Sequence, residues 1–83
     1  MMHPSVHLNG TGRDNLAEQA ADAADALRQA VIALERAAPN ARDYYTQGDS
    51  AYSIARQEYE ERVRAVRAVL VEIVALQQHI ADA

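Results

Sequence analysis

The sequence predicts an all-α fold in which two long antiparallel helices form a helical hairpin, and copies of this hairpin assemble into a homo-oligomeric helical bundle. Apolar residues recur at alternating spacings of three and four over two long segments, a spacing typical of helices packed at a shallow angle. Turn-forming residues separate the two segments. We therefore predict a single helical domain over residues 1–83, with an extended N-terminal segment (1–10), a helix (11–38), a connection (39–49) and a second helix (50–81).

Composition and charge narrow the class of protein. The chain has 83 residues and a formal net charge of −4, which argues against binding a nucleic acid polymer or an anionic membrane by bulk electrostatics. It has no cysteine, so disulfides, thiol nucleophiles and thiolate metal sites are excluded. No apolar run approaches the roughly 20 residues of a membrane span, and the start lacks a signal-peptide pattern. We expect a cytoplasmic protein.

The N-terminal segment has neither helical nor strand periodicity. Asn9-Gly10 favours a tight turn, and Thr11 with Asp14 three residues later fits a capping box, so the first helix is expected to begin at Thr11. A frayed tail that ends in a cap is the alternative interpretation. Against it, apolar side chains such as Val6 and Leu8 are costly in a segment that is only solvated.

The first helix carries a seven-membered apolar seam with 4-3-4-3-4-3 spacing. Its members are Leu16, Ala20, Ala23, Leu27, Ala30, Leu34 and Ala37. Alanines in this seam allow the partner helix to come close and have high helix propensity. Ile32 lies off the seam and is expected to be exposed in a monomer, and Pro39 is expected to end the helix.

The second helix, capped by Asp49 or Ser50, has the matching seam. That seam consists of Tyr52, Ala55, Tyr59, Val63, Val66, Leu70 and Ile73, continued by Leu76 and Ile80. Glu58–Arg62 and Glu60–Arg64 are expected ion pairs at i,i+4 spacing. Apolar residues point nearly all the way round the second half of this helix, and a helix that is apolar on most sides is buried on most sides.

A single hairpin covers only one stripe on each helix, so part of the apolar surface has no partner within the chain. The uncovered residues are Val69, Val71 and Val74, with Ile32 on the first helix. Because a wet patch of this kind is a solubility liability, we predict a homo-oligomer, a dimer or larger, whose copies complete the core. In the alternative interpretation, the N-terminal segment folds back and covers the patch with Val6 and Leu8.

Metal binding and catalysis are not expected. His3, His7 and His79 lie at the same end of the predicted hairpin, but no acidic residue accompanies them in the N-terminal segment. The carboxylates are mostly on solvated helix faces, and no metalloprotease, nucleophile-elbow or phosphate-loop motif occurs. We expect no metal site, no cofactor and no enzymatic activity.

The connection is the candidate binding site because it is longer than a simple link between helices requires. Arginine offers a planar fork for phosphate, and tyrosine offers a ring for stacking and a hydroxyl group. The candidate ligand-binding residues are Arg42, Tyr44, Tyr45 and Gln47 from one chain, with His7, Asn9 and Thr11 from its neighbour. The two groups sit at opposite ends of a hairpin roughly 40 Å long, so only an antiparallel neighbour brings them together. Alternatively, one tyrosine plugs the seam and Arg42 only complements the helix dipole.

Two strings resemble a pattern found in small tailed-phage and prophage proteins. They are His7-Leu8-Asn9-Gly10-Thr11 and the run from Asn40 to Gly48, although Ala41 stands where those proteins commonly have glycine. In size and helical architecture alone, the chain is also similar to phage anti-CBASS sponge proteins, helical oligomers that sequester cyclic nucleotides at subunit interfaces. The likeness of the two strings points to a phage or prophage source and to no particular activity. The likeness in architecture implies a counter-defence protein that acts in the cytoplasm of an infected bacterial host. It would sequester a nucleotide-type immune signal, a cyclic oligonucleotide or ADP-ribose derivative, without cleaving it. The alternative is a protein–protein interaction module, such as an anti-CRISPR or a phage accessory protein that blocks a host protein.

Overall fold

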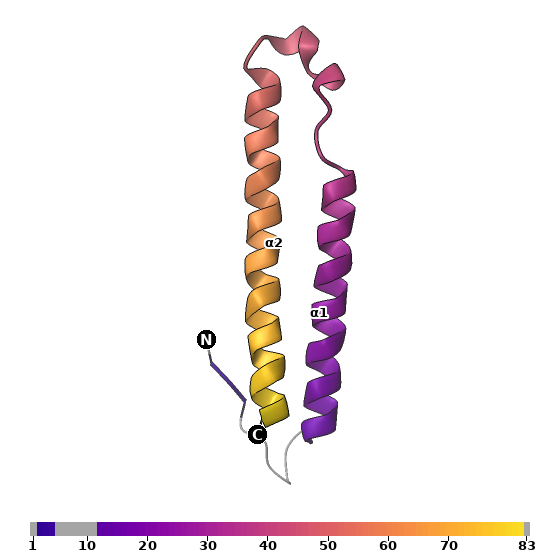
Figure 1. The fold of residues 1–83 in the computed structure, drawn as a ribbon, viewed down its shortest axis with the longest axis vertical. Coiled ribbons are helices and arrows are strands. Elements are labelled where there is room, and N and C mark those ends of the chain that lie inside the picture. Colours follow the sequence, from indigo (N-terminus) through magenta and orange to yellow (C-terminus); the bar gives the residue numbers. More distant parts are fainter. Residues whose placement is uncertain (1, 5–11, 83) are drawn as a thin grey trace.

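The computed structural model describes residues 2–4 and 12–82, and these residues form the predicted helical hairpin (Figure 1). Helix α1 spans Arg13–Arg36 and helix α2 spans Ala51–Asp82. Two short 3-10 turns, η1 (Ala41–Asp43) and η2 (Tyr45–Gln47), lie between them. The part of the chain that the structure describes contains no strand, so the all-α prediction is confirmed.

The bounds of α1 differ slightly from the prediction. Its N-cap is Gly12, whose carbonyl accepts a hydrogen bond from the Leu16 N–H at 3.0 Å. Glycine has no side chain that could cap the helix. The expected cap at Thr11 lies outside the described residues. The helix ends at Arg36, three residues before Pro39, and the Ala37 N–H closes the last turn on the carbonyls of Ala33 and Leu34.

The interface between α1 and α2 follows the predicted seam on α2 but not throughout α1. Every predicted seam residue of α2 is at least half-buried, and Ile80 is fully buried. On α1, however, Ala23 and Ala37 are exposed, and Ala24 and Val31 are buried in their place beside Ala20. The reason is that a straight α-helix repeats every 3.6 residues, so the contact line steps from Ala20 to Ala24 and on to Val31.

The ion pairs also correct one expectation. Glu58 and Arg62 pair within α2 at 3.6 Å, as predicted. Glu60 does not pair with Arg64; it accepts a hydrogen bond from Nε of Arg56, one turn earlier, at 3.2 Å.

A single ion pair joins the two helices within the described residues. Nη2 of Arg67 on α2 lies 2.7 Å from Oε1 of Glu35 on α1. Both side chains are about half-exposed, so this pair contributes at most about 1 kcal/mol to stability. The pair lies on one broad face of the hairpin, and the helix repeat then shows which other residues lie on that face.

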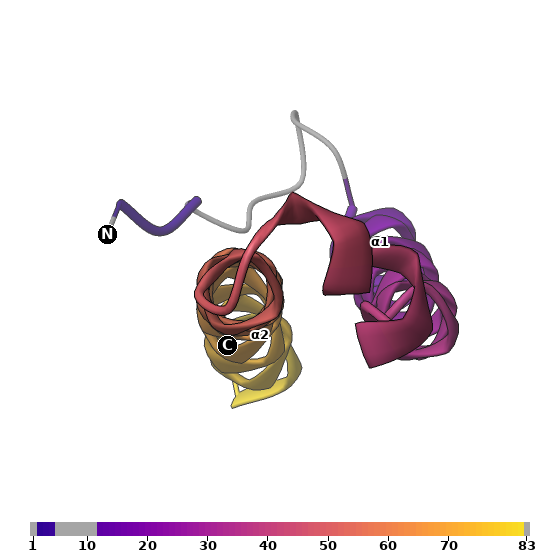
Figure 2. The same cartoon turned by 90° about the horizontal axis from the view of Figure 1, so that it is seen from above.

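The hairpin is a single layer of two helices lying side by side (Figure 2). Its principal extents are 61 × 20 × 16 Å and its radius of gyration is 18.4 Å. A compact domain of this length has a radius of gyration of about 12 Å. Because a stable domain normally packs two layers around a core, this geometry leaves the seam with little cover. Only Ala20, Ala24, Val31 and Ile80 are buried among the described residues.

The predicted unpartnered apolar residues are exposed. Val71 is 68% exposed and Val69 is 45% exposed, while Ile32 and Val74 are also on the surface. Val6 and Leu8, which the alternative interpretation places over this patch, lie outside the described residues. His3 stacks on His79 of α2 with ring centroids 4.2 Å apart, so the described part of the N-terminal segment sits at the end opposite the connection, as expected (Figure 1).

Within the described residues, neither helix is long and apolar enough to cross a membrane.

Candidate functional site

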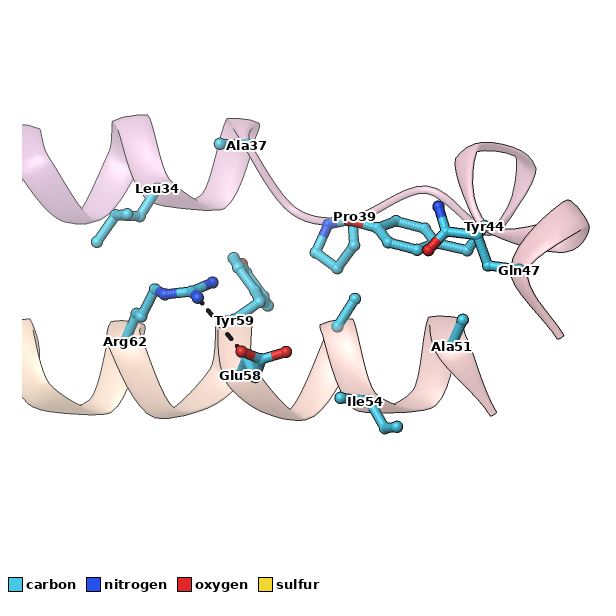
Figure 3. A pocket seen from close by; sticks show the side chains of 11 residues that line it. Leu34, Ala37, Pro39, Tyr44, Gln47, Ala51, Ile54, Glu58, Tyr59 and Arg62 are labelled. Atoms are coloured by element: carbon cyan, nitrogen blue, oxygen red, sulfur yellow. Dashed lines mark ion pairs between the residues drawn. The ribbon is translucent and has the colours of Figure 1, made fainter. Parts of the chain in front are cut away.

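A groove lies where the end of α1, the connection and the first turns of α2 meet (Figure 3). Its volume is about 510 Å³, within the range of about 300–1,000 Å³ that is usual for small-molecule sites. Its walls come from all three segments: Leu34, Ala37, Pro39, Tyr44, Gln47, Ala51, Ile54, Ala55, Glu58, Tyr59 and Arg62. Leu34 and Pro39 point toward α2, and Tyr59 and Arg62 point back from α2 (Figure 3).

The groove exists because α2 extends past the end of α1. Helix α1 has 24 residues and α2 has 32, so α2 is longer by about 12 Å at 1.5 Å per residue. Near the connection, the first turns of α2 therefore face the connection instead of another helix (Figure 1). A connection packs less tightly than a helix, and a hollow remains.

A side-chain hydrogen bond, a glycine with positive φ and an aromatic contact fix the conformation of the connection. The side chain of Asn40 accepts a hydrogen bond from the backbone N–H of Arg42 at 3.0 Å and caps η1. Gly48 has φ +107° and ψ 165°, a conformation that is essentially restricted to glycine, and it turns the chain into α2. Between these points, the ring of Tyr44 is half-buried and tilted against Tyr52 of α2, with centroids 6.4 Å apart.

Two tyrosines and one arginine supply most of the groove's chemistry. The rings of Tyr44 and Tyr59 are both half-buried and offer faces for stacking. Arg56 does not line the groove, but its guanidinium group lies 5.1 Å from the centre of the Tyr59 ring in a cation–π contact, so one face of this ring is left for a ligand. Arg62 contributes a positive charge that Glu58 partly neutralises at 3.6 Å. An anionic ligand must therefore compete with Glu58 for Arg62.

The structure brings only some of the predicted binding residues to this groove. Tyr44 and Gln47 line it. Arg42 and Tyr45 do not: Arg42 is exposed on η1, and Tyr45 is 80% exposed at the start of η2. The other three candidates, His7, Asn9 and Thr11, lie outside the described residues.

Tyr59 and Arg62 belong to the groove but were not recognised from the sequence. The seam pattern assigns Tyr59 to the helix interface, and the i,i+4 rule assigns Arg62 to a surface pair with Glu58. The unequal lengths of the two helices would have revealed their position, because an early end of α1 uncovers this part of α2. Pro39 indicated such an end, but the helix stops three residues before it.

The described residues contain no group of three or more potential metal ligands. The stacked rings of His3 and His79 are not part of any such group.

Comparison with known proteins found no matching family model, no matching curated protein and no matching solved structure.

Proposed function

We propose that this chain is a non-enzymatic binding protein that takes a small, flat-ringed, anionic molecule of the nucleotide class into the groove between its helices. The observation that carries this proposal is the convergence of two tyrosine rings and one arginine on a groove of about 510 Å³. Stacking of a base on an aromatic ring is worth about 1–3 kcal/mol, and arginine presents a fork that matches phosphate.

Each polar residue of the groove has a distinct role in this proposal. Tyr44 and Tyr59 hold the ring of the ligand, and Arg62 binds its phosphate. Gln47 has both a donor and an acceptor and reads the polar edge of the ring. Tyr45 and Arg42 are exposed and do not line the groove, so they are left for contacts with a neighbouring copy.

The proposal includes self-association of the chain into a dimer or larger assembly. Its support is the single-layer shape and the exposure of Val69. In the biological role suggested by the architectural likeness to the sponge proteins, the assembly captures a nucleotide-type immune signal in an infected bacterium and does not cleave it.

Titration calorimetry with cyclic di- and trinucleotides and with cyclised ADP-ribose products tests the proposal. Tyr44→Ala and Arg62→Gln should abolish binding of the recognised compound, whereas Tyr45→Ala, outside the groove, should retain it. Glu58→Gln should tighten binding up to about fivefold, because it removes the competitor for Arg62 from an exposed ion pair. Binding that is lost in Tyr45→Ala but kept in Tyr44→Ala would move the site out of the groove, and weaker binding to Glu58→Gln would exclude an anionic ligand.

A second candidate function is a protein–protein interaction module that blocks a host protein. The exposed apolar side chains of Val71 and Ile32 favour it, because exposed apolar surface that gathers into a patch marks a contact with a partner. This candidate predicts no response to any compound of the panel. It also predicts that a purified host protein binds the chain, that the Val71→Asp variant loses this binding, and that the Tyr44→Ala variant keeps it.

A further inference from the structure

The hairpin exposes more surface than a folded chain of its mass normally does. Its accessible surface is 6192 Å², whereas compact monomers of 9.1 kDa expose about 4,900 Å². Over the length of α1, about 36 Å, a broad face that is 20 Å wide has a footprint of about 700 Å². A stable interface buries about 800 Å² on each partner, so one broad face is close in size to such an interface.

The two broad faces of the hairpin differ in chemistry. The face marked by the Glu35–Arg67 ion pair is charged. Because seven residues make almost two full turns, Glu60 and Val74 lie on the same side of α2 as Arg67. Arg56, the partner of Glu60, lies there as well. We call this side the charged face.

The opposite side carries the groove, and there the Glu58–Arg62 ion pair and Glu72 stand among apolar residues. Leu34 and Arg62 line the groove, and residues two turns away from them lie on the same side of each helix: Leu27 on α1, and Val69 and Leu76 on α2. Ala30 and Ala65 fall between these positions. We call this side the groove face. Val69 is 45% exposed and the leucines are only half-buried, so this face lacks a cover within the described residues.

Charge is distributed unevenly along the hairpin. The terminal half (residues 12–28 and 68–82) has two arginines and six carboxylates, whereas the connection half (29–67) has six arginines and six carboxylates. The net charge of −4 therefore resides in the terminal half. Two hairpins packed in the same direction place their negative halves side by side. Antiparallel packing places each negative half against the arginine-bearing half of the partner, which is electrostatically preferred.

We propose that a second copy of this chain packs antiparallel on the groove face, so that the two copies form a four-helix bundle and the terminal half of each copy closes the groove of the other. This inference rests on the proposed self-association and deepens it by naming the face and the direction. In such a dimer α2 crosses α2 of the partner near Val69, and the start of α1 lies beside the partner's groove. The bound ligand is thereby enclosed between subunits.

Cysteine cross-linking tests this geometry on a natural background that has no cysteine. The Val69→Cys variant should form a disulfide-linked dimer on mild oxidation, because residues near a two-fold axis approach their own copies. Ala65→Cys and Glu72→Cys, one turn before and after Val69, locate the axis. Val71→Cys is the matched control: at 68% exposure it is more accessible than Val69, so random collisions would cross-link it faster. We expect the 9.1 kDa chain to double in mass for at least one variant of the groove face and to remain single for the control.

The outcomes separate this inference from the proposals on which it builds. A dimer in sedimentation that cross-links through Val71→Cys and through no position of the groove face overturns the choice of face. A monomer in sedimentation at micromolar concentration overturns both this inference and self-association. Calorimetry with the nucleotide panel then reports on ligand binding separately, and a ligand that binds a monomer leaves the groove proposal standing. Circular dichroism confirms that each variant is as helical as the natural chain.

Discussion

Truncation of Ile80 gives the most direct test of how α2 packs against α1 at the terminal end. Ile80 is 1% exposed and is the largest fully buried side chain among the described residues. Ile80→Ala removes three carbons, worth about 0.8 kcal/mol each when buried, and leaves a cavity that raises the usual cost to about 2–5 kcal/mol. A small gain in helix propensity offsets only a few tenths of a kcal/mol of this loss. We expect a net destabilisation of about 3 kcal/mol.

Thermal unfolding followed by far-ultraviolet circular dichroism measures this loss. In a domain of this size 1 kcal/mol shifts Tm by about 4–8 °C, so the expected decrease is about 10–25 °C. Protein concentration is held fixed, since Tm of a self-associating protein depends on it. Val71→Ala is the control: its side chain is mostly in solvent, and its effect should stay within about 0.5 kcal/mol in a monomer. Equal effects of the two substitutions would refute the packing described for the end of α2.

Three further substitutions probe the connection and the interhelical contact. Gly48→Ala should destabilise the chain by about 1–3 kcal/mol. The cause is the backbone φ of +107° alone, since an added Cβ meets no atom within 4 Å. A chemically synthesised chain with d-alanine at position 48 should keep its stability, and equal tolerance of both forms would contradict this backbone conformation. Asn40→Ala should cost about 1 kcal/mol in denaturant unfolding, because the cap of η1 is lost, whereas Asn40→Asp, which keeps the acceptor, should cost little. A double-mutant cycle on Glu35 and Arg67 should give a coupling of about 0.2–1 kcal/mol that decreases with added salt; a coupling insensitive to salt would argue against an exposed ion pair.

The sequence predicted the helices well because apolar periodicity is their dominant signal. The same signal located the α2 seam from Tyr52 to Ile80, where bulky side chains define one line. It was less accurate on α1, where alanines are frequent on several sides. With a small side chain at both positions, Ala23 and Ala24 fit a seam equally well, and only packing against α2 selects Ala24.

The residues that line the groove were harder to predict, because their positions depend on where each helix ends. Tyr44 and Gln47 were identified from the unusual composition of the connection and do line the groove. Tyr45 is the immediate neighbour of Tyr44, yet it starts the next 3-10 turn and points to solvent. Adjacent residues in tight turns face different directions, and composition alone cannot tell which of two tyrosines faces inward.

The groove and the exposure of the groove face have the same structural cause. Two helices form only one layer, so each has one side that no other helix can cover, and the longer helix also extends beyond its neighbour. The connection fills the space beyond the end of α1 incompletely, which leaves the groove. Leu27, Leu34 and Val69 continue from it along the same side of the hairpin. A partner copy that covers this side therefore also covers the groove. Ligand binding and self-association should accordingly be coupled: a ligand that bridges both copies must strengthen the dimer by the same factor by which dimerisation strengthens its own binding. Sedimentation with and without ligand measures one side of this equality, and calorimetry on the dimer and on a monomeric Val69→Asp variant measures the other.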